Sequence, residues 1–218
     1  MSPQSDKMRR GIAAQTMVVI LAAGKGTRMG RADMAKVCFE IGGVPAINRI
    51  IRTFRSLGFE RFMVVVGAQS EQVQEAVNAE HAGVVYVYQS PQLGTGHAAR
   101  VAGEALCTLG HQGYVLVTMG DKFIEPEAVI ALCDGFIRQN ADMALLSIPR
   151  TRASAGSVGR IFIDDDGQAL DIIEMADLAR QAISDALRKR LENPQPIAAR
   201  ELGACIQEHL PDVKRQAA

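Results

Sequence analysis

Short apolar runs recur along the first two thirds of the chain, and segments with helical spacing separate them. The apolar runs have the length expected of buried strands, and they lie at 16–22, 62–66, 84–88, 114–118 and 143–148. Apolar residues recur with helical spacing in the segments near 44–57, 70–79, 95–109 and 125–139. This alternation predicts an α/β fold with a doubly wound, mostly parallel sheet that helices cover on both faces.

The pattern changes after Pro149. Residues 159–174 are typical of a β-hairpin with Asp166–Gly167 at its turn. Helical spacing returns at 176–192 and again from Ala198 to Leu210. We therefore expect three parts: a polar and flexible N-terminus at 1–15, an α/β domain at 16–175 and a C-terminal helical segment at 176–218.

A glycine-rich segment, LAAGKGTRMG at 21–30, directly follows the first predicted strand. Its glycines let the backbone approach a ligand closely and adopt positive φ, which exposes successive N–H groups to an anion. Lys25 and Arg28 add two positive charges to the same segment. The spacing fits neither the Walker pattern nor the dinucleotide fingerprint. The segment predicts a polyphosphate site, although a purely structural turn would have the same glycines.

Two further polar residues follow predicted strands. Gln89 comes after the run at 84–88, and Asp121 comes after the run at 114–118. Ligands of doubly wound sheets lie beyond the carboxyl ends of the strands, so these residues and the glycine segment are expected to share one site. Mg²⁺ is often held by one or two carboxylates together with phosphate oxygens, which suits Asp121. A helix cap or a turn is the structural alternative for this aspartate.

Four motifs occur in family order between about Met17 and Glu174: LAAGKGTRM, Lys36 within AKVCFEIGGVP, QSPQLGTGHA at 89–98, and MGD at 119–121. Together they resemble the sugar-1-phosphate nucleotidyltransferases. The greatest similarity is to the N-acetylglucosamine-1-phosphate uridylyltransferase domain of the bifunctional bacterial enzyme. The resemblance implies a Rossmann-like nucleotidyltransferase fold and Mg²⁺-dependent transfer of UMP from UTP to a sugar-1-phosphate, with N-acetylglucosamine-1-phosphate as the expected acceptor and pyrophosphate as the second product.

The resemblance also implies roles for particular residues. The catalytic positions are Arg28, Lys36 and Asp121, and Asp121 is the expected metal ligand. The nucleotide-binding positions are Leu21, Ala22, Ala23, Gly24, Lys25, Gly26, Gln89, Gly94 and Thr95. The sugar-binding positions are Gly159 and Glu174. His97 is interpreted as structural more readily than as catalytic, and Ala35 stands where the family usually has a proline before the lysine.

The chain departs from the family in its later part. The relatives have a sugar-binding asparagine in an Asn-Thr-Gly strand and a second metal ligand in a later strand. The four asparagines of this chain stand in no such context. The chain is therefore either a piece of a longer enzyme or a shortened homologue. The functional alternatives are a nucleotide-binding or regulatory module without turnover, and a nucleotidyltransferase with a different nucleotide or acceptor.

Composition excludes several partners. The chain has 24 basic and 24 acidic residues, so its formal net charge of zero gives no electrostatic reason to expect nucleic acid binding. Its apolar runs are too short to span a bilayer. Its four cysteines are scattered, which is typical of reduced thiols in a cytoplasmic protein. The expected partners are thus UTP and a sugar-1-phosphate, without a membrane, and the oligomeric state is left open.

Overall fold

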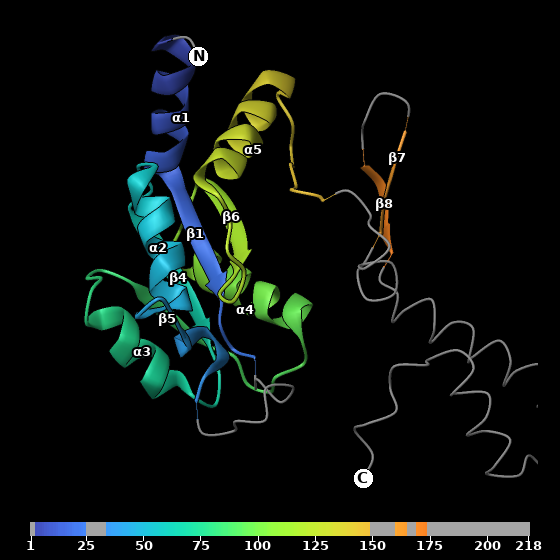
Figure 1. The fold of residues 1–218 in the computed structure, drawn as a ribbon. Coiled ribbons are helices and arrows are strands. Elements are labelled where there is room, and N and C mark those ends of the chain that lie inside the picture. The colour runs from blue at the N-terminus through green and yellow to red at the C-terminus, as the bar shows by residue number, and fades with distance from the viewer. Residues whose placement is uncertain (1–2, 25–33, 149–159, 165–168, 174–218) are drawn as a thin grey trace, which may run out of the picture. The chain divides into compact units, whose positions relative to one another are not determined.

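The computed structural model describes residues 3–24, 34–148, 160–164 and 169–173. The chain divides into two compact units, 1–146 and 147–218, and Figure 1 shows the course of the first unit. Within the described residues, no helix is both long enough and apolar enough to cross a membrane.

The first unit is built on four parallel strands in the order β5–β4–β1–β6. Their bounds are Thr16–Leu21 for β1, Arg61–Val66 for β4, Val85–Tyr88 for β5 and Tyr114–Met119 for β6. Every residue of β1 is buried, because β1 has a strand on each side and apolar layers above and below it. Such strands are typical of parallel sheets covered on both faces.

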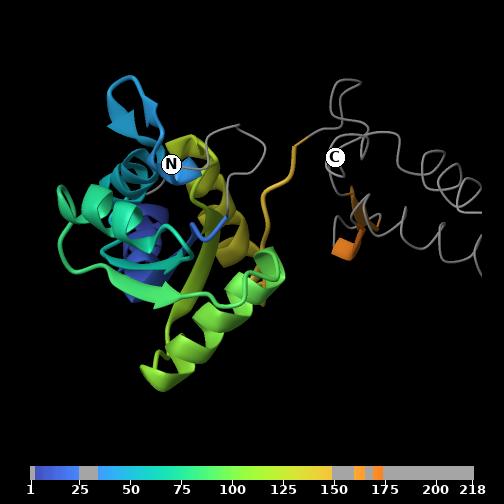
Figure 2. The same ribbon diagram turned by 90° about the horizontal axis from the view of Figure 1, so that it is seen from below.

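Helices lie on both faces of this sheet (Figure 2). They are α1 (Pro3–Gln15), α2 (Ala46–Ser56), α3 (Ser70–Asn78), α4 (Thr95–Thr108) and α5 (Pro126–Gln139). Val18 and Ile20 of β1 belong to the larger core, which takes apolar residues from α1, α2, α3 and α5. Val19 and Leu21 point to the other face and belong to the core formed with α4. The predicted doubly wound α/β fold is confirmed.

The N-terminal segment differs from its prediction. Residues 3–15 form α1 instead of a flexible arm. Ala13 is buried in the larger core, and Arg9 forms an ion pair with Asp134 of α5 at 3.3 Å. The polar composition of the segment gave no hint of these contacts, because they depend on α5, which lies more than a hundred positions later.

The predicted strand at 143–148 is wrong, since these residues adopt no regular structure and Met143 and Ile148 are largely exposed. A strand needs a ladder partner, and in the described part of the chain β6 pairs with β1 alone. In the second unit, β7 (Arg160–Ile163) and β8 (Ala169–Ile173) pair antiparallel. The expected turn at Asp166–Gly167, the boundary after residue 175 and the two C-terminal helices lie outside the described residues.

A small hairpin follows the glycine segment and a short helix. Its strands are β2 (Glu40–Ile41) and β3 (Val44–Pro45), and its turn consists of Gly42 and Gly43 with φ of 58° and 73°. A two-residue turn with positive φ at both positions favours glycine because other residues would be strained there. Arg49 of α2 donates from Nε to the carbonyl oxygen of Ile41 at 2.6 Å and so fixes the hairpin against α2.

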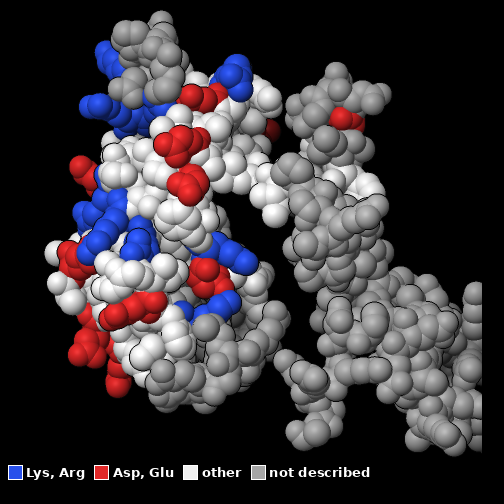
Figure 3. All heavy atoms as spheres, viewed as in Figure 1, with Lys and Arg blue, Asp and Glu red and all other residues white. Residues whose placement is uncertain are grey.

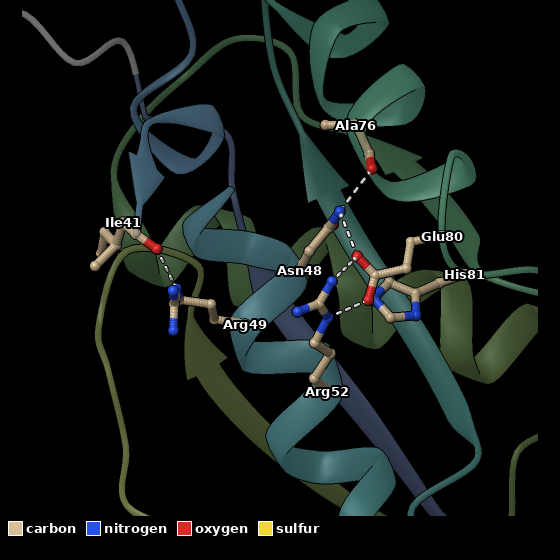
Figure 4. Close-up of polar contacts among 7 residues, drawn as sticks. All are labelled: Ile41, Asn48, Arg49, Arg52, Ala76, Glu80 and His81. Atoms are coloured by element: carbon tan, nitrogen blue, oxygen red, sulfur yellow. Dashed lines mark hydrogen bonds and ion pairs between the residues drawn. The ribbon is translucent and has the colours of Figure 1, made fainter. Parts of the chain in front are cut away.

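A polar cluster of Asn48, Arg52, Glu80 and His81 joins α2 to the segment after α3 (Figure 4). Glu80 accepts hydrogen bonds from Nε and Nη2 of Arg52 and from Nδ2 of Asn48, and Nε2 of His81 lies 3.4 Å from its carboxylate. Asn48 also donates to the carbonyl oxygen of Ala76 at 2.8 Å. The hydrogen bond from Arg52 lowers the pKa of Glu80, whereas burial lowers the pKa of His81. We call these four residues the Glu80 cluster.

Candidate functional site

The candidate site lies along the edge of the sheet where the parallel strands end. The first residues after β1, β5 and β6 continue the hydrogen bonding of the sheet beyond the strand ends. The three backbone bonds are Ala22 N–H to Val65 O at 2.8 Å, Gln89 N–H to Val66 O at 2.9 Å, and Gly120 N–H to Leu21 O at 2.9 Å. From β1 the chain passes outward to β4 and β5, and it returns to the other side of β1 as β6. The switch point therefore lies between β1 and β6, where doubly wound folds bind ligands.

The glycine segment begins at this switch point. Leu21, Ala22 and Ala23 are buried, and Gly24 is exposed at the start of the segment. The predicted residues Lys25, Gly26 and Arg28 lie outside the described residues. The predicted nucleotide-binding residues at 21–24, which the structure describes, therefore lie at the end of β1 and directly after it.

Lys36 and Asp121 meet beside this strand end. Lys36 is the first residue of the 3-10 helix η2 (Lys36–Cys38), and Asp121 is the second residue after β6. The lysine Nζ donates to Oδ2 of Asp121, and the two side chains are 44% and 16% exposed. Oδ1 of Asp121 is buried and has no hydrogen-bond partner in the described part of the chain. Two residues 85 positions apart therefore form one charged pair with a free carboxylate oxygen.

This free oxygen suits a hard cation. Mg²⁺ takes oxygen ligands, usually one or two carboxylates, and completes its coordination with phosphates and water. The described residues contain no group of three or more His, Cys, Asp or Glu side chains that could hold a metal by themselves. Asp121 therefore fits a metal that arrives with a phosphate ligand better than a metal held by the protein alone.

Ala35 presents Lys36 much as a proline would. Its φ of −62° and ψ of 130° lie within the range that proline adopts. Unlike proline, it keeps an N–H, which donates to Oε1 of Gln72 at 2.8 Å. Gln72 on α3 thus fixes the residue before the lysine. The sequence gave no sign of this role, because a helical glutamine usually faces water.

Gln89 and Gly94 form the other end of the site. Gln89 is buried, and its Nε2 donates to the carbonyl oxygen of Gly94 at 3.0 Å and lies 3.0 Å from Nδ1 of His97. Gly94 precedes α4 with φ of 96° and ψ of −175°, a conformation that is essentially restricted to glycine. Thr95 is exposed at the first position of α4. The structure therefore joins Gln89 to Gly94, which Thr95 follows in the chain, and adds a contact with His97.

Gln92 and Gly67 are part of this site but were missed in the sequence. Gln92 donates from Nε2 to the carbonyl oxygen of Ala23 at 2.7 Å, and this bond joins the QLGTG turn to the end of β1. Its Oε1 is buried and has no partner in the part of the chain that the structure describes. A Cβ atom at Gly67 would overlap the Gln92 amide and lie 2.7 Å from Ala23 O. Glycine at 67 therefore makes room for the hydrogen bond between Gln92 and the end of β1.

The sugar-binding residues predicted at Gly159 and Glu174 lie outside the described residues. The described site therefore consists of two ends along one sheet edge: the Lys36–Asp121 pair near β1 and β6, and the Gln89–Gly94 turn beyond β5. A triphosphate could lie with its phosphates at the first end and its base at the second. On the face drawn in Figure 3, acidic and basic side chains are interspersed.

Known proteins resemble this chain in sequence and in fold. A model of the MobA-like NTP transferase domain matches residues 18–212. The chain is 39% identical over 165 residues to a protein of Roseobacter denitrificans named bifunctional protein GlmU, and 36% identical over 186 residues to the GlmU of Hyphomonas neptunium. The matches cover 75% and 85% of this chain but 35% and 38% of those proteins, so the chain spans little more than a third of their length.

A solved structure shares the fold. HddC from Yersinia pseudotuberculosis, whose crystal structure is complexed with GMP-PN, superposes with a TM-score of 0.52 at 21% identity. The match covers 72% of this chain and 68% of HddC. At this level of identity the comparison supports the Rossmann-like nucleotidyltransferase fold alone.

Proposed function

The chain belongs to the MobA-like NTP transferase family, and from this premise we propose that it transfers UMP from UTP to a sugar-1-phosphate, with N-acetylglucosamine-1-phosphate as the first candidate acceptor. The family makes it a nucleotidyltransferase. The observation that supports the finer proposal is the sheet edge described above, where the polar turn that follows β5 and the charged pair beside β1 and β6 lie beyond the carboxyl ends of strands of one parallel sheet.

The choice of uracil rests on Gln89. The carbonyl oxygen of Gly94 can only accept a hydrogen bond, so the nitrogen of the Gln89 amide must face it. This leaves the amide oxygen as the group available to a ligand. Uracil has an N–H at ring position 3 that can donate to this oxygen, whereas cytosine has an acceptor at the same position. With its nitrogen turned to Gly94, the side chain offers a base an acceptor.

The charged end of the site suits the phosphates. Asp121 would hold Mg²⁺ through its free oxygen, and the metal would neutralise charge on the phosphates and on the leaving group. Lys36 would turn from Asp121 to the reacting phosphate, while Lys25 and Arg28 would hold the pyrophosphate. These roles place positive charge where negative charge develops, which is the main way in which such sites accelerate phosphoryl and nucleotidyl transfer.

The reaction needs no protein nucleophile. A phosphate oxygen of the sugar-1-phosphate forms a bond to the α-phosphorus of UTP. The bond from that phosphorus to the bridging oxygen breaks, and the electron pair leaves with pyrophosphate. The protein contributes by aligning the two substrates and excluding alternatives, which lowers the entropic part of the barrier.

The test is pyrophosphate release by the purified chain with Mg²⁺, each of the four nucleoside triphosphates and a panel of sugar-1-phosphates. We expect release with UTP and at least one hexosamine-1-phosphate, and none without the sugar phosphate. Tight UTP binding without release would favour the module that has lost turnover. Activity with GTP and not with UTP would contradict the assignment of the base.

A further inference from the structure

Ala35 is the buried residue through which the chain enters η2, the short helix that carries Lys36. It is 2% exposed, and both polar groups of its backbone are paired. Its carbonyl oxygen accepts from the N–H of Cys38 at 2.8 Å, and its N–H donates to Oε1 of Gln72 at 2.8 Å. A buried N–H that loses such a partner is costly to keep in place. The entry to η2 therefore depends on a side chain of α3.

The other side of η2 is held by packing. Val37 is buried in the larger core, and a Cβ atom at Gly120 would lie only 2.9 Å from its Cγ1. The short helix thus lies directly against the residue before Asp121. Packing at Val37 fixes how closely η2 approaches the Asp121 segment, whereas the Gln72 bond fixes the backbone on the other side of Lys36.

We infer that Gln72 is a positioning residue for Lys36. By holding Ala35, it orients η2 so that the lysine Nζ lies at Asp121 in the free protein and within reach of the reacting phosphate during turnover. This inference rests on the proposed function and extends it to a side chain on a different helix. Lysine has a long and flexible stem, so the position of its charge depends on a fixed backbone. Small displacements of such a group slow a reaction strongly.

The backbone angles of Ala35 suggest a way to replace Gln72. The φ of −62° and ψ of 130° would suit a proline, whose ring fixes φ and leaves no N–H in need of a partner. A proline ring would also occupy the space between the Ala35 nitrogen and Oε1 of Gln72, so the ring and the long side chain exclude each other. Gln72 should therefore matter when residue 35 is alanine and become dispensable when it is proline.

A purely structural role for Gln72 predicts something different. Loss of its hydrogen bond would then lower the melting temperature, but the Lys36–Asp121 pair would keep its geometry. The affinity of Asp121 for a cation and the rate of the chemical step would both stay unchanged. These two quantities separate a positioning role from a structural one.

The test uses three variants of the full chain. Gln72→Ala removes the acceptor, and Ala35→Pro/Gln72→Ala also removes the N–H that needed it. Gln74→Ala is the matched control, because it makes the same change on the same helix at a residue that does not bond Ala35. For each, Mn²⁺ affinity of the nucleotide-free chain would be measured by paramagnetic resonance, and kcat and KM for UTP by pyrophosphate release. A thermal melt would establish that each variant folds.

We expect Gln72→Ala to bind Mn²⁺ roughly threefold more tightly than the wild type, because the pair is loosened without being removed. Its kcat should fall about tenfold with little change in KM for UTP, since the lysine acts on the reacting phosphate more than on the bound nucleotide. Ala35→Pro/Gln72→Ala should regain most of both losses, and Gln74→Ala should match the wild type.

A folded Gln72→Ala chain with the Mn²⁺ affinity and kcat of the wild type would overturn this inference and leave the proposed function standing. A loss of kcat that persists in folded Ala35→Pro/Gln72→Ala would also overturn it. A wild-type chain without turnover would contradict the proposed function, whereas the Mn²⁺ titration would still decide whether Gln72 holds the Lys36–Asp121 pair.

Discussion

Two carboxylates of the first unit, Glu80 and Asp121, are surrounded very differently. Glu80 receives hydrogen bonds from Arg52 and Asn48 and lies beside His81. Asp121 is bonded to Lys36 through Oδ2, and its Oδ1 is buried without a partner among the described residues. Buried polar atoms are nearly always paired in folded proteins, so an unpaired oxygen requires an explanation.

The difference separates a structural carboxylate from one that can bind a ligand. Arg52 and Asn48 use most of the acceptor capacity of Glu80, and the Arg52 bond holds its pKa below the usual range. Oδ1 of Asp121, at the switch point of the sheet, has no hydrogen-bond partner among the residues that the structure describes. Lys36, the partner of Asp121, is a single charge on a flexible stem, which can turn to a phosphate. In the structure the two charges are paired with each other.

Asp121→Asn should give the largest effect. It removes the anionic metal ligand but keeps the shape of the side chain, so turnover should fall by about a hundredfold or more. Stability should change little, since the substitution removes a half-paired charge. Pyrophosphate release and a thermal melt on the same samples would measure both. An active variant would exclude Asp121 from the reaction.

Lys36→Gln should strengthen metal binding while it weakens catalysis. Without the lysine charge, Asp121 is free to bind a cation, and the affinity of the nucleotide-free chain for Mn²⁺ should rise roughly tenfold, equivalent to about 1.4 kcal/mol. Paramagnetic resonance of unbound Mn²⁺ measures this directly. Lys122→Gln is the matched control, because it removes one exposed charge beside Asp121 without touching the pair. Equal affinities in Lys36→Gln and in the wild type would show that the pair does not restrict the metal.

Glu80→Gln should have the opposite effect to Asp121→Asn: it should lower stability and leave turnover nearly unchanged. The amide presents an N–H toward Arg52 or Asn48 and loses a charge-assisted bond, so the free energy of unfolding should fall by about 1 kcal/mol. Turnover at saturating substrate should stay close to that of the wild type. Urea denaturation followed by circular dichroism, alongside the same pyrophosphate assay, tests both statements. A stable but inactive Glu80→Gln variant would remove the distinction between the two carboxylates.

The smallest effect concerns His81 and pH. Burial lowers its pKa below the value of 6.5 expected in the unfolded chain, and Glu80, Arg52 and Arg55 are the charged groups that act on it. As the pH falls below 6.5, the unfolded chain takes up a proton before the folded chain does, so stability falls. His81→Gln should remove this part of the fall in stability between pH 7.5 and pH 5.5. Urea midpoints at the two pH values test it, and a wild-type chain that becomes more stable at pH 5.5 would contradict the sign.

The core strands were predictable because a strand that is buried on both faces consists almost entirely of apolar residues, which is visible in the sequence. The run FMVVV at 62–66 became β4 within one residue, and the run at 114–118 became β6. The run MALLSI at 143–148 has a similar apolar content, but a ladder depends on a neighbouring strand that no local pattern reveals. The helix at 3–15 was missed for the opposite reason, since its few buried positions are fixed by α5.

The site was predictable only in part. Resemblance and the strand ends indicated Gln89, Gly94 and Asp121 as residues of one edge. The direction of the Gln89 amide was not predictable, because it depends on whether its neighbours are donors or acceptors in three dimensions. Gln92 and Gln72 were missed because their partners are backbone atoms 69 and 37 positions away, and no motif of side chains marks such bonds.

The three backbone bonds that carry the ladder past the strand ends also set the rate at which these amides exchange with solvent deuterium. Ala22, Gln89 and Gly120 donate to buried strand carbonyls. Their protons should therefore exchange only when this edge of the sheet opens, whereas the exposed amide of Gly24 should exchange at once. These three amides mark the border between the slowly and rapidly exchanging parts of the site. A bound nucleotide should move that border outward into the glycine segment, so exchange reports occupancy of the site even in a variant that has lost turnover.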